Sequence, residues 1–281
     1  MIPAPRSALF VPAMRERAIS RAATAGADML ILDLEDATGP DEKTEARNVI
    51  ATALDLWSSA QTLRAVRINA PDTDHWRDDL EAVQNADAIV VPKILSVDDL
   101  QTIRAAMRDD TPLWAMIETP ESLLNLRDIA QAAIDLGVAG LIAGTNDLTK
   151  SLRLPSGSGR FGLIPHLAQI VAAARAGGVH VLDGVYNAYK DTDGFAREAE
   201  EGRNLGFDGK TLIHPGQVAA ANSAFGPNEA EIDWAKRVIT AFNDPANSGK
   251  GVIAMDGEMI ERLHLVRARA IHDRKPDGDA S

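Results

Sequence analysis

Short apolar runs recur along the chain, separated by longer stretches in which apolar positions return with helical spacing. Eight such runs occupy residues 8–11, 29–32, 65–68, 88–91, 113–117, 138–142, 180–182 and 209–213. Continuous apolar runs of this length are typical of strands that are buried on both faces of a parallel sheet. The intervening stretches predict amphipathic helices, for example over residues 15–25, 43–54, 97–108 and 195–205. Eightfold alternation of strand and helix favours an α/β fold of the (β/α)8 TIM-barrel type over an open sheet.

The chain continues beyond the eighth strand–helix unit. We therefore expect a catalytic barrel over residues 1–225 and a C-terminal helical extension over residues 226–281. Within the extension the pattern predicts a helix at 228–242, a loop at 244–250, a strand at 251–255, a helix at 258–271 and a frayed tail at 272–281. The extension packs either on its own barrel or as an arm on a neighbouring subunit. We favour the arm, and with it a homo-oligomer, a trimer or a hexamer.

Composition and charge narrow the class of protein. Of the 281 residues 45% are hydrophobic, which is enough for a large core, and no cysteine is present, which excludes disulfides, thiolate nucleophiles and zinc–sulfur sites. The formal net charge of −12 argues against a nucleic-acid partner. The N-terminal residues lack the pattern of a secretory signal, and no apolar stretch approaches the roughly 18 residues of a membrane helix. We expect a soluble, cytoplasmic protein without a membrane partner.

Carboxylates follow several of the predicted strands. They are Asp33, Glu35 and Asp36 after the second strand, Glu118 after the fifth, Asp147 after the sixth and Asp183 after the seventh. Functional residues of such barrels lie at these C-terminal strand ends, and like charges gathered there need a cation. Acidic residues also cap helices, so several of these side chains have a structural alternative. That alternative is weakest for Glu118, which follows its apolar strand directly.

The donor set points to a particular kind of metal. Carboxylates without thiols and with little histidine favour magnesium, or manganese, over zinc. Magnesium usually takes one or two protein carboxylates and keeps other positions for water and substrate. We expect Glu118 and Asp147 to be these two ligands.

Several segments together resemble the citrate lyase β-subunit-like family, which includes the HpcH/HpaI aldolases and the malyl-CoA lyases. They are RSALFVP at 6–12, LDLED at 32–36, VRIN at 66–69, VPK at 91–93, MIET at 116–119, GTNDL at 144–148, LDGV at 182–185 and GKTLIHP at 209–215. They occur in family order, and the resemblance extends from residue 6 to about residue 265. Each segment is short, and the ordered set carries the resemblance.

The resemblance implies a magnesium ion held by Glu118 and Asp147, with Arg67 gripping a carboxylate of the 2-oxo acid half of the substrate. A planar guanidinium suits this task because two parallel hydrogen bonds fix the orientation of the acid. A structural ion pair is the alternative for Arg67. An arginine within an otherwise apolar strand is costly without a dedicated partner, so we favour the functional interpretation.

Other residues complete the expected site. Backbone amides around Gly144, Thr145 and Asn146 are expected to cradle the same substrate carboxylate, because small residues let a ligand approach the backbone. Glu35 and Asp36 are expected near the metal, where they orient its waters or serve as a base. The residues alone do not decide which of these two carboxylates faces inward.

The thioester half of the substrate involves a different set of residues. The resemblance suggests that Arg6 and Lys93 lie near the coenzyme A end, with His214 beside them. The alternative interpretation of Lys93 is a surface lysine without a function, and that of His214 is a group that caps a helix. Coenzyme A carries phosphates, so this acidic protein must offer it a local basic cluster.

One segment departs from the family pattern. Family members commonly read Gly-x-Met-Ile-Asp-x-Pro near the C-terminus, and that Asp reaches an adjacent subunit's site as an acid or base. Here residues 257–263 read GEMIERL, so Glu261 replaces the Asp and the Pro is absent. The extra methylene moves the carboxylate by more than about 1 Å, which can cost orders of magnitude in rate. Thioester hydrolysis and condensation are therefore less expected than cleavage.

The reaction that the resemblance implies is retro-Claisen cleavage of a 3-hydroxyacyl-CoA thioester of the malyl, citramalyl or citryl type. Its ligands are a small 2-oxo acid and an acyl-CoA. Two alternatives stay open: a metal-dependent aldolase that cleaves free hydroxy acids, and a non-catalytic citrate-lyase-like subunit. Intact Arg67, Glu118 and Asp147 count against the second alternative, while the altered Glu261 leaves it open.

Overall fold

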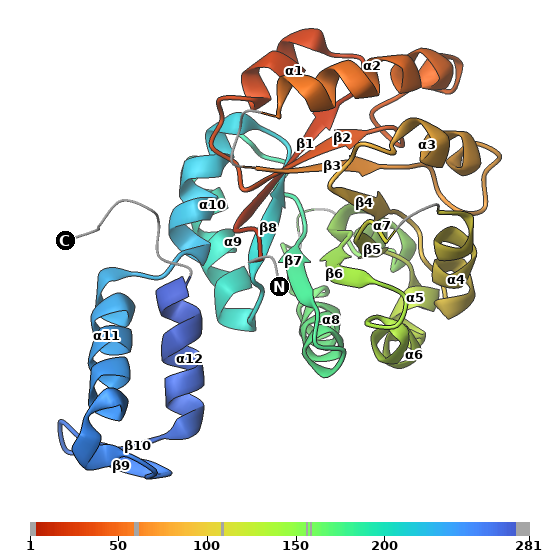
Figure 1. Ribbon diagram of the computed structural model, residues 1–281. Helices are drawn as coiled ribbons and strands as arrows, with labels where there is room; N and C mark the ends of the chain where they lie inside the picture. Colours follow the sequence, from red (N-terminus) through yellow and green to blue (C-terminus); the bar gives the residue numbers. More distant parts are fainter. Residues whose placement is uncertain (1–3, 59–61, 108–109, 156, 158, 274–281) are drawn as a thin grey trace. The chain divides into compact units, whose positions relative to one another are not determined.

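A closed barrel of parallel strands forms the centre of the computed structural model, which describes residues 4–58, 62–107, 110–155, 157 and 159–273. Each strand pairs in parallel with the next along the chain, and β8 pairs with β1 to close the barrel (Figure 1). The strands are β1 Ser7–Pro12, β2 Met29–Asp33, β3 Leu63–Arg67, β4 Ala88–Val91, β5 Leu113–Ile117, β6 Val138–Ala143, β7 His180–Asp183 and β8 Gly209–Leu212. The predicted TIM barrel is confirmed.

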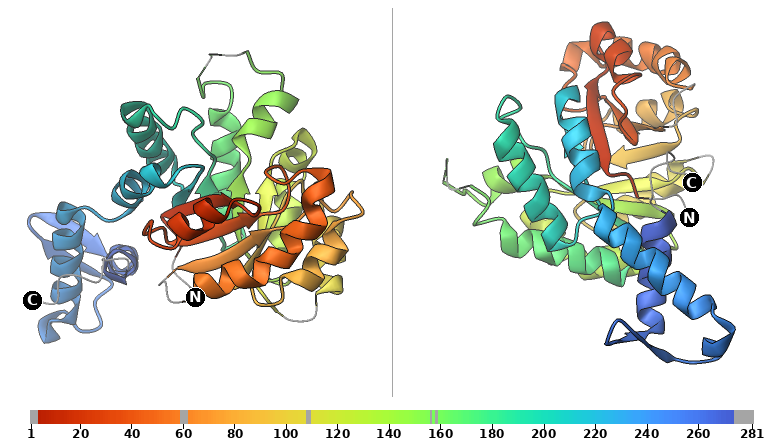
Figure 2. Two further views of the ribbon diagram at one scale, coloured as in Figure 1. Left: turned by 90° about the horizontal axis from the view of Figure 1, so that it is seen from above. Right: turned by 90° about the vertical axis from the view of Figure 1, so that its left-hand side faces the viewer.

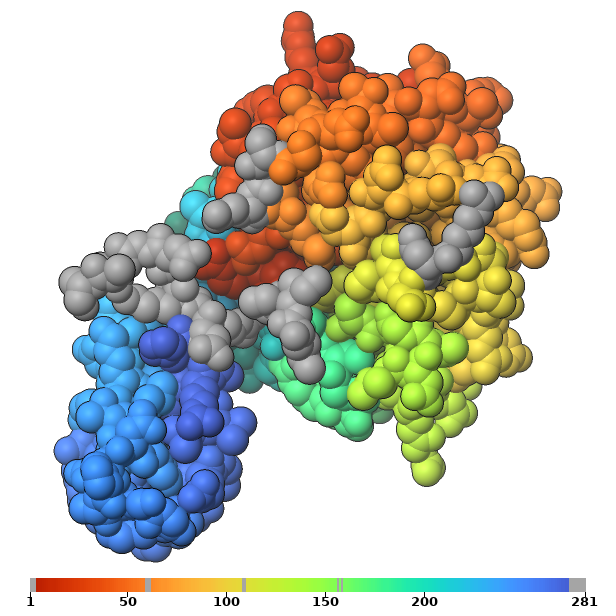
Figure 3. All heavy atoms as spheres, in the orientation of Figure 1, coloured from red at the N-terminus to blue at the C-terminus, as the bar shows by residue number. Residues whose placement is uncertain are grey.

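Helices surround this barrel, because each crossover between parallel strands must return along the outside of the sheet. They are α1 Glu16–Ala22, η1 Pro40–Glu42, α2 Lys43–Leu56, α3 Trp76–Ala82, α4 Val97–Ala106, α5 Pro120–Leu124, α6 Leu126–Ala132, α7 Thr145–Ser151, α8 Ile164–Ala176, α9 Thr192–Leu205, η2 Pro215–Gln217 and α10 Val218–Phe225. Figure 3 shows all heavy atoms in the same orientation as Figure 1. No described helix is both long and apolar enough to cross a membrane.

Two apolar layers hold the barrel together. Side chains that alternate along the strands point either into the barrel, as Met29 and Ile31 do, or outward against the helices, as Leu30 and Leu32 do. Trp114 lies in the inner layer, and a Cβ atom at Gly140 would come within 2.3 Å of its ring. The inner layer therefore fills the barrel below the strand ends where functional residues are expected.

The C-terminal residues form a second compact unit that begins after Phe225. It contains α11 Glu229–Asn243, η3 Pro245–Asn247, β9 Val252–Met255, β10 Glu258–Glu261 and α12 Arg262–Asp273. The two long helices lie side by side, with the β9–β10 hairpin at one end of the pair (Figure 2, right). The preference for an arm that packs on a neighbouring subunit, over packing on its own barrel, stays a prediction.

The prediction of one helix over residues 258–271 is wrong at its start. Residues 258–261 form β10, which pairs in antiparallel fashion with β9. Asp256 and Gly257 join the two strands with φ angles of 55° and 85°. An Asp-Gly pair with two positive φ angles is a strong signal for a two-residue hairpin turn, and the helical pattern obscured it. His272 and Asp273, expected in the tail, belong to α12, and residues 274–281 lie outside the described residues.

Candidate active site

A cavity of about 370 Å³ opens at the C-terminal ends of the barrel strands. Its wall includes eight of the residues that the sequence singled out, namely Asp33, Asp36, Arg67, Glu118, Gly144, Thr145, Asn146 and Asp147. These residues come from the ends of β2, β3, β5 and β6 and from the loops or helices that follow the strands. Parallel strands thus bring together side chains that are far apart along the chain.

Arg67 ends β3 and has a dedicated partner in Asp33, which ends β2. The two residues are opposite each other in the parallel register. Arg67 Nε and Nη2 donate to the two carboxylate oxygens of Asp33 at 2.8 and 2.7 Å. Burial alone would raise the pKa of Asp33, but the charge and hydrogen bonds of Arg67 outweigh it and hold that pKa below its usual range. The structural ion pair considered for Arg67 therefore exists, and it fixes one edge of the guanidinium at the cavity wall.

The loop after β2 is held by a network that the sequence did not reveal. Asp33 Oδ1 and Oδ2 accept hydrogen bonds from the backbone amides of Glu35 and Ala37. Lys43 donates from Nζ to the carbonyl groups of Leu34 and Glu35 at 2.6 and 2.7 Å. The sequence indicated Asp33 only as one of several strand-end carboxylates, without a positioning role. Its place directly after the apolar run was the one signal of that role. Asp33 positions both Arg67 and the loop that carries the next two carboxylates.

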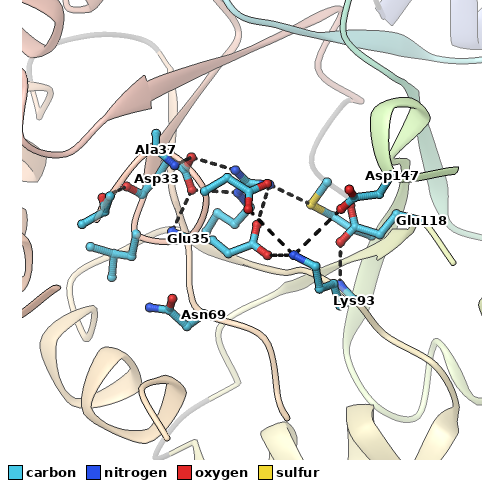
Figure 4. Close-up of polar contacts among 12 residues, drawn as sticks. Asp33, Glu35, Ala37, Asn69, Lys93, Glu118 and Asp147 are labelled. Atoms are coloured by element: carbon cyan, nitrogen blue, oxygen red, sulfur yellow. Dashed lines mark hydrogen bonds and ion pairs between the residues drawn. The ribbon is translucent and has the colours of Figure 1, made fainter. Parts of the chain in front are cut away.

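Glu35 and Asp36 have different surroundings. The buried Glu35 carboxylate forms an ion pair with Arg67 Nη1 at 2.8 Å, and its other oxygen contacts Lys93 Nζ (Figure 4). Burial raises the pKa of Glu35, and the neighbouring cations only partly offset this. Asp36 is exposed and lines the cavity. Of the two candidate bases, Asp36 is the one that faces the cavity.

Glu118 is buried at the end of β5, where it accepts a hydrogen bond of 2.6 Å from the backbone amide of Lys93. Burial first, and then the negative charges of Glu35 and Asp147, raise the pKa of Glu118 to about 7. A nearby cation would stabilise the charged form of a carboxyl group whose pKa is raised in this way. Among the residues that the structure describes, no group of three His, Asp or Glu side chains is arranged to hold a metal.

The residues after β6 lie close to Glu118. A Cβ atom at Gly144 would come within 2.3 Å of Glu118 Cβ, so this position leaves no room for a side chain. Thr145 Oγ1 is buried and has no hydrogen-bond partner among the described residues, although Thr145 lines the cavity. Asp147 lies in the first turn of α7. Two carboxylates on one cavity, with an unpartnered hydroxyl beside them, fit magnesium and an oxygen-rich ligand.

The structure does not bring every predicted residue to this cavity. Arg6 precedes β1, at the opposite end of the barrel, and its guanidinium donates to both carboxylate oxygens of Asp28 at 2.8 Å. This position does not support contact with a thioester, and that role stays a prediction. Lys93 lies among Glu35, Glu118 and Asp147, and its expected place near the coenzyme A end stays a prediction.

Two further predicted residues are His214 and Glu261. His214 caps η2 by accepting a hydrogen bond from the Gly216 amide at 3.1 Å, and its ring stacks on Tyr189 with centroids 4.8 Å apart. The capping alternative for His214 is therefore confirmed, while its role beside the coenzyme is untested. Glu261 ends β10 in the C-terminal unit and is exposed there. Its catalytic role stays a prediction.

Asp183 has a structural role. Its carboxylate is fully buried and contacts Lys210 Nζ at 2.7 Å and Arg160 Nη2 at 2.6 Å. A Cβ atom at Gly202 of α9 would lie 2.7 Å from this carboxylate, so Asp183 points outward between strand and helix. It does not belong to the carboxylates that line the cavity.

Comparison with known proteins adds three findings. The model of the HpcH/HpaI aldolase/citrate lyase family matches residues 6–215. The chain is 44% identical over 266 residues to a (3S)-malyl-CoA thioesterase from Cereibacter sphaeroides, which covers 94% of this chain and 92% of that protein. It is 34% identical over 283 residues to the citrate lyase subunit beta of Escherichia coli K12, which covers 96% of this chain and 92% of that subunit.

A solved structure is similar over nearly the whole chain. It is CitE from Mycobacterium tuberculosis in complex with magnesium, acetoacetate and coenzyme A. The TM-score is 0.77 at 30% sequence identity, and the match covers 97% of this chain and 98% of that one.

Proposed function

Because this chain belongs to the HpcH/HpaI aldolase/citrate lyase family, we propose that it is a magnesium-dependent carbon–carbon lyase. Its substrate is a 3-hydroxyacyl-CoA thioester of the malyl, citramalyl or citryl type. The products are a 2-oxo acid and an acyl-CoA. The observation that carries this proposal is the convergence of Arg67, Glu118 and Asp147 on one cavity at the C-terminal strand ends.

Glu118 and Asp147 would hold the magnesium ion. Their hard oxygen donors suit it. Burial first, and then the charges of Glu35 and Asp147, raise the pKa of Glu118, and a bound cation would favour its charged form. A bound magnesium ion would lower the pKa of the substrate hydroxyl and orient the adjacent carboxylate. The related CitE protein binds magnesium together with coenzyme A, which supports the same cofactor here.

The protein's own side chains would bind and orient the substrate and exchange protons with it. Arg67 is held by Asp33 through Nε and Nη2 and by Glu35 through Nη1, and it would offer the remaining N–H groups of Nη1 and Nη2 to the carboxylate of the 2-oxo acid half. Cleavage of the carbon–carbon bond leaves a thioester enolate that must take up a proton. Asp36, which faces the cavity, is the candidate to take the proton from the substrate hydroxyl.

Thioester hydrolysis is a second candidate function. It is favoured by the 44% identity to a malyl-CoA thioesterase. Hydrolysis would act on the same thioester but break the carbon–sulfur bond by attack of water. Replacement of the family's Asp by Glu261 counts against this activity on geometric grounds. The two candidates share a substrate and differ in the bond that is broken.

One assay separates these functions. The purified protein is incubated with magnesium and malyl-, citramalyl- or citryl-CoA, while released 2-oxo acid and released coenzyme A thiol are followed in parallel. Cleavage releases 2-oxo acid without free thiol, whereas hydrolysis releases thiol without 2-oxo acid. Cleavage of free hydroxy acids alone would identify an aldolase instead, and no product from any substrate would favour a non-catalytic subunit. The Glu118→Gln variant is the control that should lose magnesium-dependent turnover.

A further inference from the structure

Lys93 has an unusual backbone conformation for its residue type. It follows β4 after one intervening residue, Pro92, and has a φ angle of 50°. Among the described residues, only Arg153 and Asp256 share a positive φ angle without being glycine, and Asp256 belongs to the hairpin turn. Residues other than glycine rarely adopt this conformation, and it persists where the surrounding contacts hold it. The contacts of Lys93 therefore indicate what the conformation serves.

The backbone of Lys93 contacts one predicted magnesium ligand. Its amide donates to Glu118 Oε1 at 2.6 Å, so the left-handed residue and the buried carboxylate are directly joined. Glu118 is confined on its other side by Gly144, whose Cβ position would lie 2.4 Å from Oε2. The carboxylate of Glu118 is thus held between the backbone of two loops.

The side chain of Lys93 lies among the remaining carboxylates. Its Nζ atom contacts the Glu35 carboxylate and lies 3.9 Å from one oxygen of Asp36 and 3.9 Å from one oxygen of Asp147. Figure 4 shows this side chain between Glu35 and the pair of Glu118 and Asp147. The contact with Glu35 places the Lys93 ammonium beside a buried carboxylate. This single positive charge lies where a divalent cation would be attracted.

We propose that Lys93 is a positioning residue that sets the affinity of this site for magnesium. Its backbone amide orients Glu118, and its ammonium is a counter-charge that competes with the metal for Asp147 and Glu35. The inference rests on the proposed function, in which Glu118 and Asp147 hold the ion. Lys93 thereby keeps the carboxylates together in the metal-free protein and weakens magnesium binding at the same time.

The Lys93→Met variant tests the counter-charge. In water, two unit charges about 4 Å apart interact strongly enough to change an equilibrium constant about fivefold, and a divalent ion doubles that energy. Salt and solvent screen part of the effect. We therefore expect the dissociation constant for magnesium, measured by calorimetry on the full chain without substrate, to fall roughly tenfold.

Three variants separate the charge from other effects. Lys93→Arg keeps the charge and should leave the dissociation constant within about twofold of the native value. Lys93→Gly removes the charge but adopts a positive φ angle freely, so it should tighten binding as Lys93→Met does. Lys190→Met removes one charge from an exposed loop position and should leave magnesium binding unchanged.

Thermal unfolding gives a second measurement. Without magnesium, Lys93→Met should unfold at a lower temperature than the native protein, because the carboxylates repel one another. With saturating magnesium the difference should shrink, since the metal supplies the missing positive charge. A purely structural lysine would lower both unfolding temperatures alike and leave the dissociation constant unchanged.

The outcomes distinguish this inference from the proposed function. If the native protein binds magnesium and Lys93→Met binds it equally or more weakly, the counter-charge role is refuted while the metal site stands. If the native protein binds no magnesium at millimolar concentration, the metal assignment to Glu118 and Asp147 fails, and the inference about Lys93 fails with it.

Discussion

Replacing Gly144 with alanine tests how tightly the structure places Glu118. Gly144 has φ and ψ angles of −87° and 75°, so alanine meets no left-handed backbone strain there. The new Cβ atom, however, would lie 2.3 Å from Glu118 Cβ and 2.4 Å from Oε2. Since nonbonded carbon atoms normally approach to about 3.5 Å, Glu118 or the β6 end must shift by about 1 Å.

A shift of this size has a predictable cost. Misplacement of a functional group by about 1 Å can lower a rate by about 100-fold, and magnesium demands near-ideal geometry from its ligands. We therefore expect Gly144→Ala to lower kcat/KM for thioester cleavage by about 100-fold and to weaken magnesium binding by about tenfold or more. Calorimetric titration with magnesium and the 2-oxo acid assay measure the two effects separately.

Two alanine variants serve as controls. A Cβ atom at Gly251 meets no atom within 4 Å, so Gly251→Ala should change neither activity nor stability. Gly140→Ala pushes against the buried ring of Trp114 at 2.3 Å and should lower the free energy of unfolding by about 1–3 kcal/mol. If Gly144→Ala kept native magnesium affinity and turnover, Glu118 would not be the closely confined ligand described above.

Three further variants probe the charges around the site. Asp147→Asn should weaken magnesium binding, measured by calorimetry, by more than about tenfold while the circular dichroism spectrum stays unchanged. If the variant bound magnesium with native affinity, Asp147 would not be a metal ligand. Lys210→Met removes one of the two cationic partners of the fully buried Asp183 and should lower the free energy of unfolding in urea by about 1–3 kcal/mol, without changing magnesium affinity. The pKa of Asp33 is lowered in the fold, because Arg67 outweighs the effect of burial. Its ion pair therefore adds stability above the unfolded pKa of about 3.9, and that stability is lost as the pH falls through the lower folded pKa. The stability deficit of Asp33→Asn should stay constant from pH 7 to about 5 and shrink below about pH 4, and a deficit that grew on acidification would contradict the assignment.

Much of the barrel was predictable because its strands are buried on both faces. Continuous apolar runs such as 113–117, set between amphipathic helical stretches, indicate buried strands of a parallel sheet. Once eight such runs are parallel neighbours, their following residues meet at one end of the barrel. This rule alone brings Arg67, Glu118 and Asp147 to the same cavity, as the structure confirms.

The same rule, applied to residues before strands, would have placed Arg6. It precedes the first apolar run, and its partner Asp28 precedes the second, so both belong to the opposite end of the barrel. The position of Lys93 was less accessible from the sequence. The contacts of Lys93 depend on its positive φ angle and on the loops that lie next to it in the fold. Neither can be recognised from the amino-acid sequence.

The charge balance of the site links the acidic sequence to an anionic substrate. Five carboxylates gather with three cationic side chains at the end of the barrel: Asp33, Glu35, Asp36, Glu118 and Asp147 with Arg67, Lys93 and Lys43. A second anion would be repelled from such a cluster. On the proposed function, a divalent ion held by Glu118 and Asp147 would offset this excess and would give the substrate carboxylate a cationic partner besides Arg67. The metal would then be needed for binding the substrate as well as for the chemical step, because without it the cavity would repel the acid that it must hold.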